Sequence, residues 1–288
     1  MPIFRSPYDP SLTRWLRGNL HSHTTNSDGS RSPQGVIDDY AVRGYDFLML
    51  SDHDFLTDPT TFDAKGMVLL PGLEVSAEGP HILQVGAKER VLPDADRQKV
   101  VDAINADGAL AIACHPNRNL YNDHWLQGTL EQLTNYAGIE IYNGTTRRNE
   151  GESAATNRWD MLLSKGINVW GYANDDSHYD GDAALAWNVV QVPEVSATAI
   201  MDALKAGRFY ASTGVTIDHL RAEGDYLNVF AKDAKRITVI ADQGRRVAQI
   251  DSNYLHYRLP EGVNWRYLRL ELWGEGETQA WTQPFWIE

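Results

Sequence analysis

Six histidines and three carboxylates occur along the chain in an order that could bind metal ions. They are His21, His23, Asp28, His53, Glu74, His81, His115, Asp176 and His178. Imidazole nitrogens bind zinc, iron or manganese, and a carboxylate can bridge two ions so that a water between them becomes an attacking hydroxide. One histidine pair on a strand is often structural, but an ordered set of nine residues is not. The set predicts a multinuclear metal site and a metal-dependent hydrolase.

The segments that contain these residues resemble the polymerase and histidinol phosphatase (PHP) family of phosphoesterases. The segments are GNLHSHTTNSDG (18–29), SDHD (51–54), GLEVS (72–76), HIL (81–83), ACHP (113–116) and DDSH (175–178). Within this family, Trp15, the IEIYNG run at 139–144 and GRFYASTG at 207–214 are similar to the carbaryl-hydrolase-like branch. The resemblance covers nearly the whole chain, and all nine ligand positions of the family are filled.

The resemblance also implies how the nine residues would share the ions. The first ion would be held by His21, His23, Glu74 and Asp176. Glu74 would bridge to a second ion held by His81 and His115, and these six residues would surround the reaction. A third ion would be held by Asp28, His53 and His178. We therefore expect two or three divalent ions of zinc, manganese or iron. Some family members have a histidine in place of Asp28, and the harder carboxylate favours manganese or iron at the third position.

Carboxylates beside the ligands are candidates for supporting roles. Asp52 and Asp54 flank His53, and either could accept the free N–H of a liganding imidazole, which would orient that imidazole. A cap on the loop that follows the strand is an equally good interpretation of both. Cys114 precedes His115 on a predicted strand, so its thiol should point away from the metals and be buried and inert.

Two arginines are candidates for binding the substrate. Arg118 follows the His115 motif in what should be a loop at the site, where a planar guanidinium could bind a phosphate or a carboxylate through two hydrogen bonds. Arg147 and its neighbour Arg148 are weaker candidates, and solvated surface is the better interpretation for at least one of them. We expect His124 to be a loop residue.

Short apolar strands alternate with amphipathic helices from residue 19 to about 193, which predicts a parallel α/β arrangement. The predicted strands are 19–23, 47–51, 67–70, 82–86, 109–114, 139–142 and 169–172. The predicted helices run from Pro33, after the cap Ser32, to Gly44, and over 95–106, 128–136 and 152–165. The ligands fall at or just after strand ends, where barrel enzymes carry their chemistry. His21 and His23, two apart on a strand, would point to one face.

The pattern changes after a further helix predicted over 196–206. Short β runs follow at 215–219, 226–231, 236–241, 247–250, 254–259, 266–273 and 281–287, and this spacing predicts a small β-sandwich. Together with the resemblance, we expect a PHP-type distorted (β/α)7 barrel over residues 1–215 and a sandwich over 216–288. Because no long Gly/Ser linker separates them, they should pack tightly. Trp265, Trp273, Trp281 and Trp286 favour core packing, with an aromatic sugar platform as the alternative.

Composition narrows the choice of partners. The chain of 288 residues has a net charge of −13, whereas a nucleic-acid backbone is bound by clustered Lys and Arg. A small-molecule substrate fits better. Cys114 is the only cysteine, which excludes an internal disulfide and fits a reducing compartment. Neither a signal-like stretch nor an apolar window of about 20 residues is found. We expect a cytoplasmic protein without a membrane partner, and its oligomeric state stays open.

Three functions compete on these observations. The first is hydrolysis of a small phosphate ester by a hydroxide that bridges two metal ions. The second uses the same site on an ester, a carbamate or a lactone, as the carbaryl-hydrolase-like resemblance implies. The third is a non-catalytic or carbohydrate-binding module, which the complete set of polar ligands disfavours because buried polar groups are costly to keep.

Overall fold

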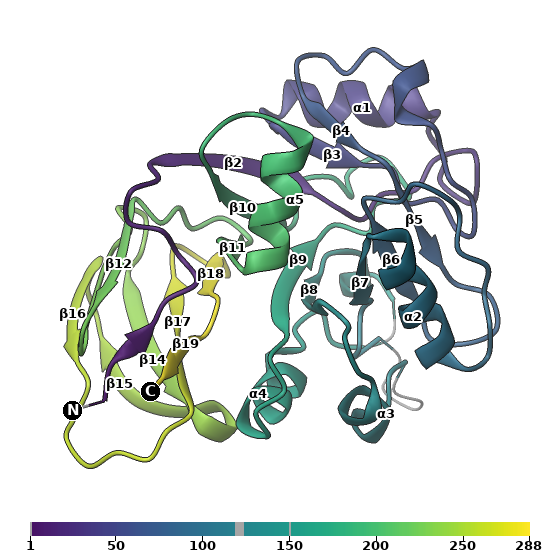
Figure 1. The fold of residues 1–288 in the computed structure, drawn as a ribbon. Helices are drawn as coiled ribbons and strands as arrows, with labels where there is room; N and C mark the ends of the chain where they lie inside the picture. The colour runs from purple at the N-terminus through teal and green to yellow at the C-terminus, as the bar shows by residue number, and fades with distance from the viewer. Residues whose placement is uncertain (1, 119–123, 150) are drawn as a thin grey trace.

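The computed structural model describes residues 2–118, 124–149 and 151–288, and its strands form three sheets (Figure 1). The largest follows the path β1 (Phe4–Arg5), β19 (Phe285–Ile287), β17 (Tyr267–Trp273), β18 (Gln279–Thr282), β11 (Phe209–Ser212), β10 (Trp187–Val192), β2 (Arg14–Asn19), β3 (Phe47–Met49) and β4 (Val68–Leu70). It also includes β14 (Arg236–Ala241), which pairs with β17, and β15 (Arg245–Ile250), which pairs with β14. The second sheet contains β5 (Gly72–Val75), β6 (Ile82–Val85), β7 (Leu110–Ala113), β8 (Gly138–Asn143) and β9 (Trp170–Asn174). The third contains β12 (His219–Glu223), β13 (Tyr226–Phe230) and β16 (Tyr254–Arg258).

The helices begin and end largely where capping residues predict. They are α1 (Pro33–Val42), α2 (Arg97–Asp107), α3 (Gln127–Gln132), α4 (Thr156–Ser164) and α5 (Ala197–Ala206), with short 3-10 turns at Pro59–Thr61, Thr145–Arg147 and Asp242–Gly244. The side chains of Ser32 and Ser196 accept hydrogen bonds from the first turns of α1 and α5, as predicted. Gly108 ends α2 with a φ of 85°, a conformation that glycine adopts without strain. Among the described helices, none has the length and apolar character needed to cross a membrane.

The chain has a mixed α/β fold, but its strands are less parallel than we predicted. Among the described strands, parallel ladders are formed by β2–β3–β4 and β7–β8–β9, which lie in different sheets, and isolated parallel bridges join Ser22 to Ser177 and His53 to Glu74. β6 is antiparallel to β5, because the short connection 76–81 leaves no room for the crossover of about a dozen residues that parallel strands need. β6 is also antiparallel to β7, although the longer connection between them contains α2. A closed (β/α)7 barrel is therefore not found in the described part of the chain.

The first predicted strand is displaced toward the N-terminus. The strand β2 ends at Asn19, so His21 and His23 follow it instead of lying within it. They are held by the segment after β9: the Asp176 N–H donates to the His21 carbonyl at 2.9 Å, and the His23 N–H donates to the Ser177 carbonyl at 2.8 Å. Their common direction thus comes from pairing between two strand ends, which one-strand periodicity does not reveal.

The C-terminal strands form the predicted sandwich, with some boundaries shifted. The strand β12 begins at His219, where we predicted a strand to end, and the run 281–287 is divided between β18 and β19 by Gln283 and Pro284. The third sheet packs on the large one through a shared core that includes Leu227, Val229, Leu255, Val239 and Leu270. Trp281 is buried and Trp286 packs against Tyr267, which favours the core role predicted for these tryptophans.

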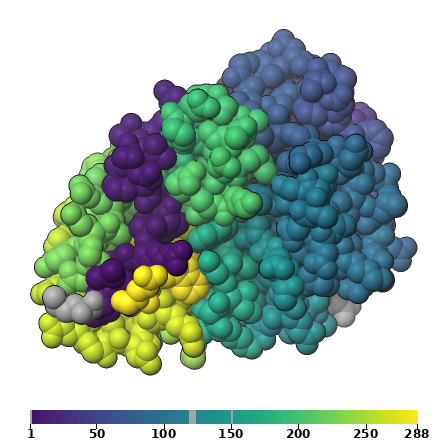
Figure 2. All heavy atoms as spheres, in the orientation of Figure 1, coloured from purple at the N-terminus to yellow at the C-terminus, as the bar shows by residue number. Residues whose placement is uncertain are grey.

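The sandwich is continuous with the rest of the molecule. The strand β18 pairs with β11, and β1 at the N-terminus pairs with β19 at the C-terminus. In Figure 2 the N-terminal segment, in purple, accordingly lies against the C-terminal end, in yellow. The boundary at residue 215 stays a prediction, but the shared sheet gives the tight packing that the missing linker led us to expect.

The joint between the two halves contains a buried ion pair that gives a first prediction. Arg269 on β17 donates to Asp160 on α4 at 2.6 and 2.8 Å, and its side chain is 2% exposed. Asp160→Ala would leave this buried guanidinium with Glu271 as its remaining acidic partner, and removal of one partner from a buried ion pair costs about 3 to 5 kcal/mol. Urea unfolding should show a loss of that size in a single transition. Asp251→Ala, which removes the exposed partner of Arg236, should change stability by less than about 1 kcal/mol.

Candidate metal centre

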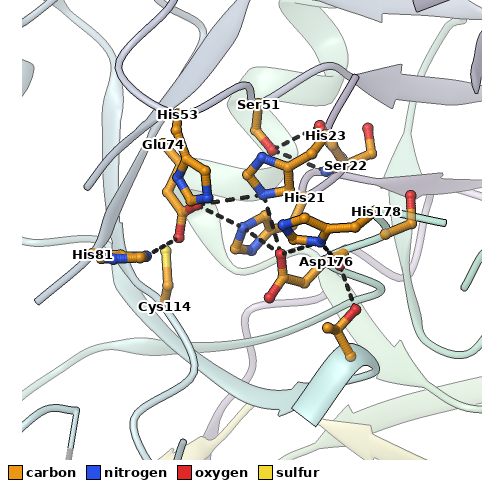
Figure 3. A network of polar contacts seen from close by, with 12 residues as sticks. His21, Ser22, His23, Ser51, His53, Glu74, His81, Cys114, Asp176 and His178 are labelled. Carbon is orange, nitrogen blue, oxygen red and sulfur yellow. Dashed lines mark hydrogen bonds and ion pairs between the residues drawn. The ribbon is translucent and has the colours of Figure 1, made fainter. Parts of the chain in front are cut away.

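The predicted ligands meet where the large sheet and the second sheet approach each other. Isolated bridges join Ser22 to Ser177 and His53 to Glu74, so the ends of β2 and β9, and β5 and the segment after β3, lie side by side. All nine predicted ligands come to this junction, and Figure 3 shows seven of them pointing toward one another. Their roles as ligands stay predictions, whereas their proximity is a property of the fold.

The most buried group contains His21, His23, Glu74 and Asp176. Asp176 Oδ1 lies 3.1 Å from Nε2 of both histidines, and Glu74 Oε2 lies 3.4 Å from the same two atoms. Donor atoms about 2.0 to 2.1 Å from one ion are about 3.0 Å apart at right angles and about 3.4 Å apart at tetrahedral angles. The four side chains therefore have the spacing of ligands around a single ion.

Unsatisfied polar atoms give an independent test of that fit. Among the described residues, His21 Nε2, His23 Nε2, His53 Nδ1, Glu74 Oε2 and His115 Nδ1 are buried and have no hydrogen-bond partner. A buried polar atom without a partner is costly, and several in one place indicate a missing ion or ligand. Four of these atoms face one another: Glu74 Oε2 lies 3.4 Å from Nε2 of His21 and of His23, and 2.9 Å from His53 Nδ1. A cation among them would be contacted by all four. The residues fit a divalent metal ion.

The other oxygen of Glu74 faces a second group. Glu74 Oε1 lies 2.8 Å from His81 Nδ1 and 3.2 Å from His115 Nε2. Because its two oxygens face different imidazole groups, Glu74 is placed to bridge two ions. The ring of His124 packs against both His81 and His115, and His124 Nε2 accepts a hydrogen bond of 2.9 Å from the His81 N–H. Sequence spacing gave His124 no role, and only the folded chain brings it to the site.

A third group lies at the open side of the centre. Asp28 Oδ1 is 3.6 Å from His53 Nε2 and 3.4 Å from His178 Nε2. The Asp28 side chain is 58% exposed and that of His53 is 25% exposed, whereas those of Glu74 and Asp176 are at most 3% exposed. Solvent and substrate would therefore reach the centre from the side of Asp28 and His53.

Glu140 on β8 contacts two of the predicted ligands, and the sequence analysis missed it. Its carboxylate accepts hydrogen bonds of 2.8 Å from His21 Nδ1, 2.8 Å from the His115 N–H and 2.8 Å from Asn174, and it is fully buried. A carboxylate on Nδ1 leaves Nε2 of His21 free to face the ion and makes the imidazole a stronger ligand. The only sequence signal was the IEIYNG run, whose spacing does not indicate which histidine it would contact.

Asp52 and Asp54 do not contact imidazoles, so the orienting role predicted for them is wrong. Among the described residues, Asp52 accepts hydrogen bonds from Thr24, Ser27 and Thr57, and Asp54 accepts from Ser76 and Ala77. Both carboxylates hold loops beside the ligands. This outcome agrees with the loop-capping interpretation, because the short aspartate side chain reaches the nearest backbone and hydroxyl donors first.

The two candidate arginines lie in different settings. Arg118 follows His115 in a turn, and its N–H donates to the His115 carbonyl at 3.0 Å. Among the described residues no acidic side chain pairs with its guanidinium. Arg147 is 50% exposed and lies 3.6 Å from Glu277, while Arg148 binds Asp182. Arg118 is thus the better placed of the two predicted substrate-binding residues.

Two of the predicted ligands have a strained backbone, as do six other described non-glycine residues elsewhere in the chain. His115 has a φ of 31° and Asp176 a φ of 54°, in a region that residues with a Cβ rarely adopt. Such conformations persist where the surroundings impose them, often at functional sites.

Cys114, just before His115, is fully buried with its thiol directed to the Ile112 carbonyl, and burial raises its pKa well above the usual value. Its Sγ nevertheless lies within 4.8 Å of ligand atoms of His21, Glu74 and His115, so the prediction that this thiol points away from the ligands is wrong.

The charges of the centre are strongly coupled. Burial alone would lower the pKa of His21, but Asp176, Glu140 and Glu74 raise it well above its usual value. Burial would raise the pKa of Glu74, but His81 and His21 hold it well below its usual range. Burial would likewise lower the pKa of His53, yet Asp28 and Glu74 raise it to about 10. Without an ion, protons on the imidazoles supply the positive charge that these carboxylates require.

Comparison with solved structures supports the fold. A two-domain protein from Bacteroides vulgatus, described as containing a predicted PHP-like metal-dependent phosphoesterase, is similar over 99% of this chain and 90% of its own, with a TM-score of 0.55 and 16% identity. A protein from Bifidobacterium adolescentis, provisionally described as a metal-dependent phosphoesterase, matches 56% of this chain and 87% of its own at 16% identity, with a TM-score of 0.43. An amidohydrolase from Chromobacterium violaceum matches 57% of this chain and 88% of its own at 17% identity, with a TM-score of 0.41. The last two are too distant to support an argument. No family model and no curated protein matches the chain.

Glu140→Gln tests the orienting role of Glu140. The amide keeps the size of the side chain but loses the charge that orients His21, so metal affinity should fall about 10- to 100-fold. Titration of metal-free protein with Co²⁺, followed by absorbance and calorimetry, would measure it. Glu271→Gln changes a mostly buried glutamate that binds Arg269 and should leave metal affinity unaltered. Equal affinities in wild type and Glu140→Gln would refute the role.

The raised imidazole pKa values predict a pH dependence. A histidine whose pKa is higher in the folded state stabilises the protein below about pH 6.5, and this contribution is lost as the pH rises through the folded value. Metal-free protein should therefore lose stability between about pH 6.5 and 10, the window set by His53. Metal must displace these protons, so binding at pH 7 should release them. Thermal unfolding would measure the loss of stability, and calorimetry in two buffers would measure the release of protons on metal binding. Stability that does not change with pH would contradict the raised pKa of His53.

Proposed function

We propose that the chain is a metal-dependent hydrolase that acts on a small phosphate ester. The observation that carries this proposal is the buried group of His21, His23, Glu74 and Asp176, whose donor atoms are 3.1 to 3.4 Å apart and partly unsatisfied. The fold shared with the PHP-like protein from Bacteroides vulgatus agrees with it. Two or three zinc, manganese or iron ions would supply a hydroxide near neutral pH and a positive charge for the developing oxyanion.

The chain's own residues would position this chemistry. Glu74 would direct one oxygen to each of two ion positions, and Glu140 would fix the ring of His21. Asp52 and Asp54 would hold the loops on which His23 and His53 lie. No protein nucleophile is required, and the thiol of Cys114, whose pKa is raised by burial, would stay protonated beside the centre.

The open side would admit the substrate past Asp28 and His53. Arg118, which has no acidic partner among the described residues, would bind two non-bridging oxygens of a phosphate there. Such a pairing would distinguish a phosphate ester from a neutral substrate. Hydrolysis of an ester, carbamate or lactone, as in the carbaryl-hydrolase-like branch, is the alternative, because the same ions would polarise a carbonyl group.

Glu74→Ala should remove more than one ion, since Glu74 contacts imidazoles of two groups. We expect wild-type protein purified under mild conditions to contain at least two equivalents of first-row metal, and Glu74→Ala to be inactive. His53→Ala, which removes a ligand from the exposed third group alone, should lose about one equivalent. Mass spectrometry for metals would measure the contents. Identical losses in both variants would contradict bridging by Glu74, and wild type that neither contains nor rebinds metal would refute the proposed function.

Arg118→Ala separates phosphate from carbonyl chemistry. If the substrate is a phosphate ester, loss of a charge-assisted pair of hydrogen bonds should cost about 1.5 to 3 kcal/mol, or roughly tenfold to more than a hundredfold in kcat/KM. Arg147→Ala, at an exposed site, should have a small effect. Both variants would be assayed with aryl phosphates, phosphodiesters, aryl esters and carbamates under manganese and zinc. Rapid ester or carbamate hydrolysis that is insensitive to Arg118, with negligible phosphate release, would favour the alternative.

A further inference from the structure

The outer face of the three-stranded sheet differs from an ordinary solvated surface. Residues on β12, β13 and β16 alternate, so that Leu220, Leu227, Val229 and Leu255 enter the sandwich core. Cross-strand pairing places the remaining residues in three rows on the other face. The rows are His219, Phe230 and Tyr254, then Arg221, Asn228 and His256, then Glu223, Tyr226 and Arg258. Every row contains at least one aromatic or imidazole ring.

Three aromatic side chains on this face are exposed to solvent and do not enter the sandwich core. Tyr254 is 47% exposed, and Tyr226 and Phe230 are each 36% exposed. The solvent side of an antiparallel sheet is usually polar, and a group of exposed rings marks an interaction site. No exposed Leu, Ile, Val or Met accompanies these rings on the nine described positions of the face. The face therefore offers flat rings and polar groups with no exposed aliphatic side chain beside them at these described positions.

Polar groups lie beside the rings in a fixed arrangement. Asn228 Oδ1 accepts hydrogen bonds from His256 Nδ1 at 2.6 Å and from the Tyr254 hydroxyl at 3.3 Å, which leaves the Asn228 amide N–H groups to donate outward. The rings of Tyr226 and His256 stack with centroids 5.1 Å apart. Glu223, Tyr226, Asn228 and His256 together line a hollow of about 390 Å³. The hollow combines the rings of Tyr226 and His256 with adjacent donors and acceptors, and the guanidinium carbon of Arg258 lies 5.5 Å from the centroid of the Tyr226 ring.

The charge of the face matches a neutral ligand. Arg221 pairs with Glu223 at 3.1 Å and Arg258 pairs with Asp225 at 2.8 Å, so both arginines are neutralised. A face of paired charges has little of the excess positive potential with which proteins attract a phosphate backbone. It also has few unpaired charges whose hydration a neutral ligand would displace without replacing it. The occupant that fits must present an apolar face to the rings and hydroxyl groups to the amide, imidazole and carboxylate.

We infer that this face binds a neutral carbohydrate, with one sugar ring in the hollow and the chain extending over Tyr254 and Phe230. A pyranose has C–H groups on its flat faces, which pack on aromatic rings, and hydroxyl groups around its edge, each of which can donate and accept a hydrogen bond. This site is independent of the metal centre, because the third sheet lies at the opposite end of the molecule from β5 and α2 (Figure 1).

Titration calorimetry of the full chain would test this inference. The probes are neutral hexasaccharides of glucose, xylose, mannose and N-acetylglucosamine, each titrated with and without EDTA. At least one should bind, with an affinity unchanged by EDTA. Tyr226→Ala and His256→Ala should each weaken binding about tenfold or more, whereas Tyr226→Phe retains the ring and should bind nearly as wild type does. Leu92→Ala, an exposed residue of another surface, is the matched control.

Several outcomes would overturn the inference. One is that none of the four sugars binds at about 5 mM, and another is that Tyr226→Ala and His256→Ala both bind as tightly as wild type while circular dichroism shows them folded. A dimer in light scattering that Tyr226→Ala dissociates would show that this face binds a second copy instead. Binding of single-stranded DNA that sugars do not compete away would assign the face to nucleic acid.

Discussion

Burial of negative charge around His21 is the constraint on which the rest of this structure depends. Glu74, Glu140 and Asp176 lie together with at most 3% of any of their side chains exposed. Each ionised carboxylate costs several kcal/mol to bury unless positive charge opposes it closely. Imidazoles alone meet that need only by keeping protons, as the raised pKa values of His21 and His53 show. Divalent ions would meet it without protonation, so the same residues that destabilise an empty centre would bind metal tightly.

The fold brings these groups together through strand ends, not through strand interiors. His21 and His23 follow β2, His53 follows β3, and Asp176 follows β9, and pairing between the segments fixes their directions. His115 and Asp176 have strained backbone that only a rigid frame can maintain. The continuous sheet and the buried pair of Asp160 and Arg269 help to supply that frame, because they join the sandwich to the half that contains the centre.

Much of the site could be predicted from the sequence because residue type and order carry the chemistry. All nine proposed ligands come together, and Ser32, Gly108 and Ser196 mark helix ends through local hydrogen bonding. The closed barrel could not be tested by periodicity, since short apolar strands look alike whether parallel or antiparallel. Glu140 was missed for a related reason: its partners lie 119 and 25 positions away in the chain, so only the folded structure reveals them.

The three ligand groups differ in burial, and this difference orders their expected affinities. The group around Asp176 is sealed and has two carboxylates, so an ion there would gain most from charge pairing in a poorly solvated environment. The group around Asp28 has one carboxylate, and that side chain is 58% exposed, so water screens its charge and keeps it mobile. Ion exchange and substrate entry would then share this open side, while the sealed ion persists through turnover. Glu74 contacts both environments through the same oxygen, Oε2, which lies 3.4 Å from His21 Nε2 in the buried group and 2.9 Å from His53 Nδ1 in the open one, so this carboxylate would couple ions bound in the two groups.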